Sequence, residues 1–170
     1  MTKRRPGTDN RVLRVCRLLN RHRVRYVIAG GVAANLHGSV RATRDVDILI
    51  PRDAANAERL LKALGELPFG VARELNAKDV LGKPVTIIGD DPRVDVLTVA
   101  WTVTYENAWP ARRVRRIAGV RVPYLSLADL IASKRTGRTQ DEADIEALRS
   151  AQRGARTSPA KRTRRAPRRA

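Results

Sequence analysis

The spacing of apolar residues along the chain switches several times between the period of a helix and that of a strand. Apolar residues at three- and four-residue intervals predict a first helix, whereas short aliphatic runs, some of them alternating with acids, predict strands. The chain is therefore expected to alternate helices and strands. In chain order the expected elements are a helix that ends near residue 22, strand 26–29, helix 32–37, strand 45–50, a helix after Asp53, strands 84–89 and 93–99, a strand pair around 111–122, and helices 127–135 and 140–152.

Turn and capping residues mark the borders of these segments. The sequence Gly-Asp-Asp-Pro at 89–92 predicts a turn between the two middle strands. Ser126 with Asp129, and Thr139 with Glu142, are expected to open the last two helices, the second pair as a capping box. The pattern predicts an α/β (α+β) fold, in which a small mixed sheet has flanking helices and two C-terminal helices close the domain.

Charge is distributed very unevenly along the 170 residues, whose formal net charge is +18. Residues 26–148 hold 17 basic and 16 acidic side chains and are nearly neutral. The stretch 149–170 holds nine basic residues, no acid and no large apolar side chain, so it cannot offset the entropy of ordering a chain. We therefore expect a basic extension over 1–8, one domain over 9–152 and a disordered Arg-rich tail over 153–170.

Composition also excludes several classes of protein. The single cysteine, Cys16, cannot form an internal disulfide framework or a Cys-rich zinc site, and it is typical of a reducing compartment. The apolar runs are far shorter than the roughly 20 residues needed to span a bilayer. No apolar segment of the kind found in secretory signals follows the basic residues at the start. We therefore expect a cytoplasmic protein with no membrane partner.

Two glycines and three aspartates form the most informative pattern in the chain. Gly30 and Gly31 end a strand where a helix begins, a geometry in which a phosphate can approach bare backbone amides. Asp45 and Asp47 lie two positions apart, so a strand places both carboxylates on one face. Asp95 lies in a later apolar strand that would add a third carboxylate if the strands were neighbours. Three such groups repel one another unless a hard divalent cation, Mg²⁺ or Mn²⁺, binds between them.

Each of these features has a structural explanation when taken alone. Gly-Gly pairs are common in turns, and Asp-x-Asp pairs are common on the solvated face of an edge strand. Asp95 comes two residues after Arg93 and fits a salt-bridged strand residue. The features occur together, in this order and with apolar flanks that bury the strands, and this combination favours a functional site.

Two other features favour a structural role. Trp101, Tyr105 and Trp109 recur every four positions, which predicts one helix face packed in the core rather than a platform for a base. His37, a single histidine on a short helix beside a loop, is expected to be a packed side chain.

A glycine pair, a short helix, an aspartate pair spaced by one residue and a later strand carboxylate resemble, in this order, the polymerase-beta-type nucleotidyltransferase superfamily. The segments Gly-Gly-x-Ala-x-x-x-His-Gly and Arg-x-Thr-x-Asp-x-Asp are similar to a small bacterial group around the AbiEii-type toxins. The resemblance covers about residues 24–150. Gly31 stands where many relatives have serine, which removes a hydroxyl and keeps the backbone amides. The resemblance implies nucleotide binding by Gly30, Gly31, Arg41, Thr43 and Lys134, and catalysis and metal binding by Asp45, Asp47 and Asp95.

The C-terminal block of the domain extends the resemblance. Lys134, Arg138 and the spaced pair Asp141 and Asp144 match the AbiEii pattern, in which the lysine binds the nucleoside triphosphate (NTP). On spacing alone, a lysine that snorkels from a helix to solvent is an equal alternative. Asp141 and Asp144 are either metal or base positions or acids favoured near the N-terminus of a helix.

The resemblance implies an enzyme that moves a nucleoside monophosphate from an NTP to an acceptor, with Mg²⁺ or Mn²⁺ as cofactor. RNA, tRNA included, is the expected acceptor because the basic ends of the chain suit a polyanion. The toxin group further implies a toxin–antitoxin role and an antitoxin partner. The alternatives are a non-enzymatic basic nucleic-acid-binding protein and a nucleotidyltransferase fold without activity. The first explains the basic tail but not the aspartates within apolar strands.

Overall fold

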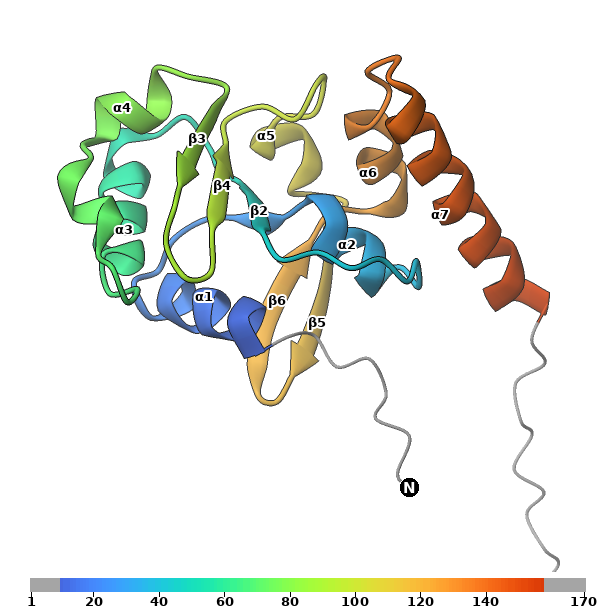
Figure 1. The fold of residues 1–170 in the computed structure, drawn as a ribbon, viewed down its shortest axis with the longest axis horizontal. Coiled ribbons are helices and arrows are strands. Elements are labelled where there is room, and N and C mark those ends of the chain that lie inside the picture. Colours follow the sequence, from blue (N-terminus) through green and yellow to red (C-terminus); the bar gives the residue numbers. More distant parts are fainter. Residues whose placement is uncertain (1–9, 158–170) are drawn as a thin grey trace, which may run out of the picture.

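The computed structural model describes residues 10–157. A six-stranded mixed sheet with the order β3-β4-β2-β1-β6-β5 forms its centre, and helices pack around it (Figure 1). This architecture confirms the α/β fold expected from the sequence. The elements are α1 (Asn10–Arg21), β1 (Val27–Ile28), α2 (Gly30–Leu36), β2 (Val46–Leu49), α3 (Ala54–Leu64), the 3₁₀ helix η1 (Val71–Glu74), α4 (Ala77–Leu81), β3 (Val85–Ile88), β4 (Val94–Leu97), α5 (Tyr105–Ala108), β5 (Arg113–Ile117), β6 (Val120–Tyr124), α6 (Leu127–Ser133) and α7 (Thr139–Thr157).

The sheet combines parallel and antiparallel pairs. β1 pairs antiparallel with β2 and parallel with β6, whereas β2 and β4 run parallel to each other. β3 and β5 pair antiparallel with their neighbours and form the two edges. The parallel pair of β2 and β4 aligns two segments that lie far apart in the sequence, and each of these segments carries an aspartate.

The helices connect the sheet to the C-terminal part of the domain. α1 packs on β6 and α3, and α2 packs on β2. α6 contacts both α2 and α7, so the C-terminal helices lie next to the helix that follows the glycine pair. In Figure 1 these helices stand at the opposite side of the domain from α3 and α4.

The core is almost entirely aliphatic, as the low aromatic content requires. Burial raises the pKa of the Cys16 thiol to about 11, so this thiol is neutral and acts as a small apolar core group. The buried face of α1 is the one that the helical spacing predicts, with Val12, Leu13, Val15, Cys16 and Leu19.

Several predicted borders are confirmed. Asp53 caps α3 by accepting a hydrogen bond from the Asn56 amide at 2.6 Å. Ser126 caps α6 by accepting from the Asp129 amide at 3.1 Å. His37 packs as expected, since its Nε2 lies 2.8 Å from the Leu125 carbonyl oxygen.

Other borders differ from the expectation. α2 begins at Gly30 rather than at residue 32, so the glycine pair forms the first turn of the helix. α7 includes Thr139 and continues to Thr157, five residues beyond the expected border at 152. The rest of the expected tail and the extension 1–8 lie outside the described residues. α4, which the sequence pattern did not predict, is opened by a capping box between Asn76 and Asp79.

The predicted aromatic helix face is wrong. α5 is a single turn that begins at Tyr105, and Trp101 lies before it with φ 59° and a side chain that is 57% exposed. Tyr105 is buried and stacks on Trp109 at 5.2 Å between ring centroids. Four-residue spacing therefore places two of the three rings together and leaves the third at the surface.

Among residues 10–157, no helix has both the length and the apolar character needed to cross a membrane.

Candidate active site

The three aspartates of the sequence pattern lie at one place on the sheet. Asp47 in β2 and Asp95 in β4 are direct partners in the parallel register, so their side chains lie side by side on the same face. Asp45 comes just before β2. Burial first, and then the charges of Asp95 and Asp45, raise the pKa of the Asp47 carboxyl above its usual range, and Lys134 and Arg93 oppose this effect.

A guanidinium group lies between two of these carboxylates. Arg93 donates to both carboxylate oxygens of Asp95, from Nε at 2.8 Å and from Nη2 at 2.9 Å. The same Nε lies 3.9 Å from an oxygen of Asp45. The Arg93–Asp95 salt bridge, which was the structural explanation for Asp95, is therefore present. It places a positive charge beside both Asp45 and Asp95.

The acids fit a hard cation in chemistry, although their side chains are not arranged as a binding site. Within residues 10–157, no group of three His, Cys, Asp or Glu side chains stands close enough together to hold a metal ion. The repulsion that raises the pKa of Asp47 is nevertheless the kind of interaction that a divalent cation removes. Asp45, Asp47 and Asp95 are the residues that would hold such an ion, and Arg93 is the cation that Asp45 and Asp95 contact in this structure.

The glycine pair lies directly against this cluster. Gly30 has φ +56°, and a Cβ added there would lie 2.0 Å from an Asp47 carboxylate oxygen. The Ala29 amide donates to the Asp47 carbonyl at 2.9 Å, which fixes the start of α2 beside β2. Within the described residues no side chain caps α2, so its first amides, next to this cluster in the chain fold, have no side-chain acceptor.

Thr43 explains why this chain has glycine at position 31. A Cβ at Gly31 would lie 2.9 Å from Cβ of Thr43 and 3.0 Å from its hydroxyl oxygen. Thr43 therefore fills the space that a serine side chain at position 31 would need, and it brings a hydroxyl to the same spot from the neighbouring loop. That loop is held by Asn35, whose side chain exchanges two hydrogen bonds with the Arg41 backbone at 2.8 and 2.9 Å.

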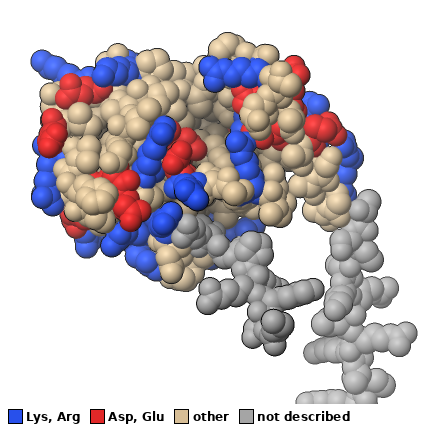
Figure 2. Space-filling view, viewed as in Figure 1, with Lys and Arg blue, Asp and Glu red and all other residues tan. Residues whose placement is uncertain are grey.

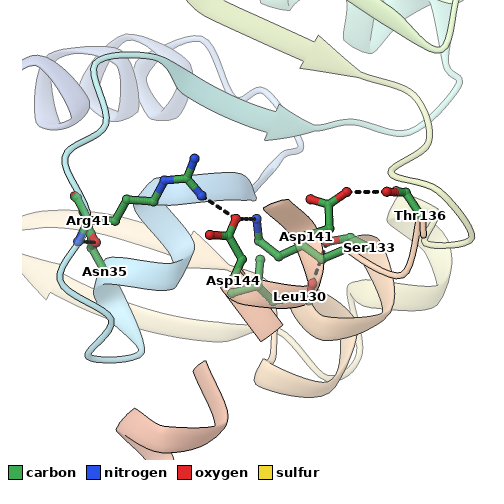
Figure 3. A network of polar contacts seen from close by, with 8 residues as sticks. Asn35, Arg41, Leu130, Ser133, Thr136, Asp141 and Asp144 are labelled. Carbon is green, nitrogen blue, oxygen red and sulfur yellow. Dashed lines mark hydrogen bonds and ion pairs between the residues drawn. The ribbon is translucent and has the colours of Figure 1, made fainter. Parts of the chain in front are cut away.

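A network of ion pairs joins this loop to the C-terminal helices (Figure 3). The Lys134 ammonium lies 2.7 Å from an Asp144 carboxylate oxygen, and Arg41 binds the same oxygen. Burial of Asp144 opposes its ionisation, but these two cations hold its pKa below the usual range. The Lys134 side chain is only 12% exposed, so it is a largely buried, paired cation rather than a snorkelling helix residue. Asp141 accepts a hydrogen bond from Thr136 in the same region.

A cleft of about 620 Å³ brings part of the predicted set together. Gly30, Asp47 and Lys134 line this cleft, whereas Asp45, Asp95, Gly31, Arg41 and Thr43 lie outside its lining. Trp101 also lines it and is the residue that sequence reasoning missed, because its spacing to Tyr105 and Trp109 suggested a core helix. The full lining is Ala29, Gly30, Asp47, Pro84, Val85, Leu97, Val99, Ala100, Trp101, Ser133, Lys134, Thr136, Arg138 and Asp141.

The contact between Gly31 and Thr43 gives a first testable prediction. Gly31→Ser is expected to lower the free energy of unfolding by about 1–3 kcal/mol, because the new side chain overlaps Thr43. Thr43→Gly in the same chain removes the overlapping atoms and is expected to recover most of this loss. Urea unfolding of the two single variants and the double variant measures the coupling. Strictly additive effects would show that the two positions do not compete for space.

Two solved structures with similar folds are described as a nucleotidyltransferase-like protein and an adenylyltransferase. An antigenic nucleotidyltransferase-like protein from Paracoccidioides brasiliensis aligns over 86% of this chain and 78% of its own, with TM-score 0.53 and 18% identity. The lincosamide antibiotic adenylyltransferase LnuA, bound to lincomycin, aligns over 85% of this chain and 98% of its own, with TM-score 0.52 and 15% identity. At these identities the likeness shows the fold alone. A comparison with curated protein sequences gave no match.

The family model described as aminoglycoside-2''-adenylyltransferase matches residues 11–148. The matched range spans the whole sheet, the glycine pair, the three aspartates and the Lys134–Asp144 ion pair. These comparisons support the nucleotidyltransferase part of the expected resemblance and do not extend to its AbiEii-type subgroup. The protein belongs to the aminoglycoside-2''-adenylyltransferase family and is a nucleotidyltransferase.

Proposed function

We propose that this nucleotidyltransferase transfers a nucleoside monophosphate from an NTP to a hydroxyl group of RNA, tRNA included. The observation that supports nucleotide transfer is that Gly30, Asp47 and Lys134 line the same cleft. It combines a close backbone approach for phosphate, a carboxylate with a raised pKa and a largely buried ammonium group. In this proposal Asp45, Asp47 and Asp95 are the catalytic carboxylates.

The cations of the network supply the triphosphate contacts. Lys134 and Arg41 both bind Asp144, so two positive charges meet on one carboxylate and have donors left for phosphate oxygens. The free amides at the start of α2 face the same region. Trp101, exposed at the rim of the cleft, offers a ring on which the base of the nucleotide can stack.

A divalent cation, Mg²⁺ or Mn²⁺, would be held by Asp45, Asp47 and Asp95. When bound, it would stabilise negative charge on the phosphates and orient the attacking hydroxyl. The residues of the chain itself neutralise the triphosphate through Lys134 and Arg41.

The contact of Arg93 with two carboxylates predicts competition with the metal. We expect Mn²⁺ to raise the melting temperature of the wild type, because it relieves the repulsion around Asp47. Arg93→Gln is expected to bind Mn²⁺ about tenfold more tightly, since Asp45 and Asp95 then lose their internal cation. The measurement is a thermal melt at increasing Mn²⁺, with Arg14→Gln on the exposed face of α1 as control. A melting temperature that ignores Mn²⁺ in all three proteins would contradict a metal site.

Charge favours RNA over a cationic acceptor. Residues 10–157 hold 26 Lys and Arg against 16 Asp and Glu, a net charge of +10, and the complete chain reaches +18. Such a field attracts a polyanion and repels a polycation. In the cleft itself, Lys134 and Arg138 stand beside Asp47 and Asp141, so the cleft offers no excess of acids.

Antibiotic adenylylation is the second candidate function, and the family match favours it. The model that matches is named for transfer to aminoglycosides, and LnuA acts on a lincosamide antibiotic. Aminoglycosides carry several amino groups, which are cationic at neutral pH. Their binding would need acids from the cleft, where Asp47 and Asp141 are the two available carboxylates among the lining residues.

One labelling experiment tests the proposal against this alternative. The purified full chain is incubated with each α-³²P-labelled NTP and Mg²⁺ or Mn²⁺, in separate reactions with total RNA, purified tRNA, an aminoglycoside mixture and a protein extract. Label in RNA that disappears with Asp47→Asn supports the proposal. Label in the aminoglycosides or in protein, with none in RNA, overturns it.

The toxin role implied by the AbiEii resemblance is a consequence of RNA transfer that can be tested separately. Modification of a cellular RNA is expected to arrest growth when the wild-type chain is induced, and Asp47→Asn is expected to abolish the arrest. Growth that continues while cellular RNA becomes labelled would remove the toxin role, and with it the need for an antitoxin, without affecting the transfer chemistry.

A further inference from the structure

A second hollow, separate from the cleft, lies at the other end of β1. It has a volume of about 730 Å³ and lies between the end of α1, the segment before β1 and the β5–β6 hairpin. None of its described lining residues is acidic. In Figure 2, basic side chains gather along the lower border of the visible face, where Figure 1 places α1 and the tip of this hairpin. The arginines that line the hollow are Arg17, Arg23, Arg25, Arg116 and Arg121.

Most of this positive charge is not neutralised by the protein. Arg25 forms an ion pair with Asp53 at 3.1 Å. For the other four arginines, no carboxylate of residues 10–157 comes within the 4.0 Å of an ion pair. The hollow therefore concentrates uncompensated positive charge from three separate segments in one concave surface.

Two of the arginines face each other at a cost to stability. Arg116 in β5 and Arg121 in β6 are direct partners in the antiparallel register, so their side chains leave the hairpin on the same face. Like charges at such positions destabilise a strand pair. An anion bound between the two guanidinium groups would remove this repulsion, which points to a negatively charged ligand.

Tyr26 and Trp109 are the aromatic residues that line the hollow, and their surroundings indicate which part of a nucleic acid would bind. Tyr26 is buried, with only 2% of its surface exposed. Arg112 lies over the ring of Trp109 at 3.5 Å from its centroid, and Tyr105 stacks on the same ring. These two contacts occupy the ring for stacking, so the hollow offers arginine donors rather than a platform for bases. Its chemistry is that of phosphate contacts, which are independent of sequence.

We propose that this arginine hollow binds the phosphate backbone of RNA. Five arginines spread over 730 Å³ exceed what a single phosphate can contact. The choice of RNA among polyanions rests on the function proposed above. The five residue steps from Arg25 to Gly30 span at most about 18 Å, so an RNA held at the hollow can reach the cleft with a nearby hydroxyl.

RNA binding without NTP tests the proposal directly. A fluorescein-labelled, 20-nucleotide single-stranded RNA is titrated with the full chain, and anisotropy is measured at several salt concentrations. The combined variant Arg116→Gln with Arg121→Gln is expected to bind about tenfold more weakly, with a salt slope smaller by about 1.4. The control, Lys62→Gln with Lys78→Gln, removes the same charge from exposed positions of α3 and α4 and is expected to leave both values unchanged.

A third variant separates binding from folding. Arg116→Glu places a carboxylate opposite Arg121, so it is expected to raise the melting temperature while weakening RNA binding more than the glutamine changes do. Equal effects of the arginine and lysine variants would overturn the proposal, since binding would then follow total charge. Displacement of the RNA by stoichiometric inorganic triphosphate would also overturn it in favour of a small-anion site.

The RNA-binding test of the hollow and the labelling test of the proposed function can fail separately. If the arginine variants lose RNA binding but the wild type labels no RNA, the hollow stands as an RNA site and the proposed function fails. If the wild type labels RNA and the arginine variants bind it normally, the function stands and the hollow is not the RNA site.

Discussion

Asp47→Asn is expected to lose nucleotide transfer almost completely and, in metal-free buffer, to melt at a higher temperature than the wild type. The loss of transfer follows from the position of the side chain, which lines the cleft beside Gly30 and is the register partner of Asp95. An amide of the same shape cannot carry the negative charge that a divalent cation or a proton transfer requires. We expect a decrease in kcat of at least about 10³-fold.

The gain in stability follows from the raised pKa of Asp47. Because burial and the neighbouring carboxylates raise this pKa, the folded protein holds the proton more tightly than the unfolded chain does. The contribution of the group to stability is therefore complete below the ordinary aspartate pKa, and it is lost as the pH rises toward the raised value. Above the raised pKa the ionised Asp47 destabilises the fold, and asparagine removes that charge with almost no change in volume.

The measurement is a thermal melt with EDTA from pH 4.5 to 8, together with a transfer assay in Mn²⁺. Asp91→Asn is the matched control, because this exposed turn aspartate lies outside the cleft and the sheet face. Its transfer rate is expected to match that of the wild type. A variant at Asp47 that keeps its transfer rate would remove this residue from the catalytic set, and one that melts below the wild type at neutral pH would refute the repulsion argument.

The sequence predicted the part of the site that depends on strand periodicity. A period of two places Asp45 and Asp47 on one face, and the apolar flanks of Asp95 predicted a buried strand, so the pairing of β2 with β4 was the one remaining assumption. The glycine pair was informative for a similar reason, since few residues tolerate the close approach that Gly30 makes to Asp47.

The parts that were missed depend on contacts between distant segments. Trp101 lines the cleft and itself has a positive φ just before α5, and no periodic pattern encodes such a backbone conformation. Asp144 was open to two explanations because one of its two partners, Arg41, lies in a loop 103 residues earlier in the chain. The arginine hollow was missed because Arg116 and Arg121 lie in the nearly neutral range 26–148, whereas Arg17, Arg23 and Arg25 lie before it, and only the fold brings the two groups together.

The second large effect is expected from a single added methyl group at Gly30. Gly30→Ala places a Cβ 2.0 Å from an Asp47 carboxylate oxygen, at a position whose φ of +56° is itself unfavourable for alanine. The φ alone costs about 1–2 kcal/mol of stability. The overlap must in addition move either the start of α2 or the Asp47 carboxylate, and a misplacement of about 1 Å in a catalytic group costs on the order of 10²-fold in rate.

Gly119→Ala separates these two contributions. Gly119, in the turn between β5 and β6, has φ +76° and no atom within 4 Å of an added Cβ, so alanine there meets the same type of backbone strain without an overlap. Because Gly119 lines the arginine hollow, the comparison uses NTP binding and transfer at saturating acceptor. Both variants are expected to lose stability in urea unfolding, but only Gly30→Ala is expected to lose transfer by about 10²-fold. Equal transfer rates in the two variants would mean that the contact between Gly30 and Asp47 does not position the catalytic carboxylate.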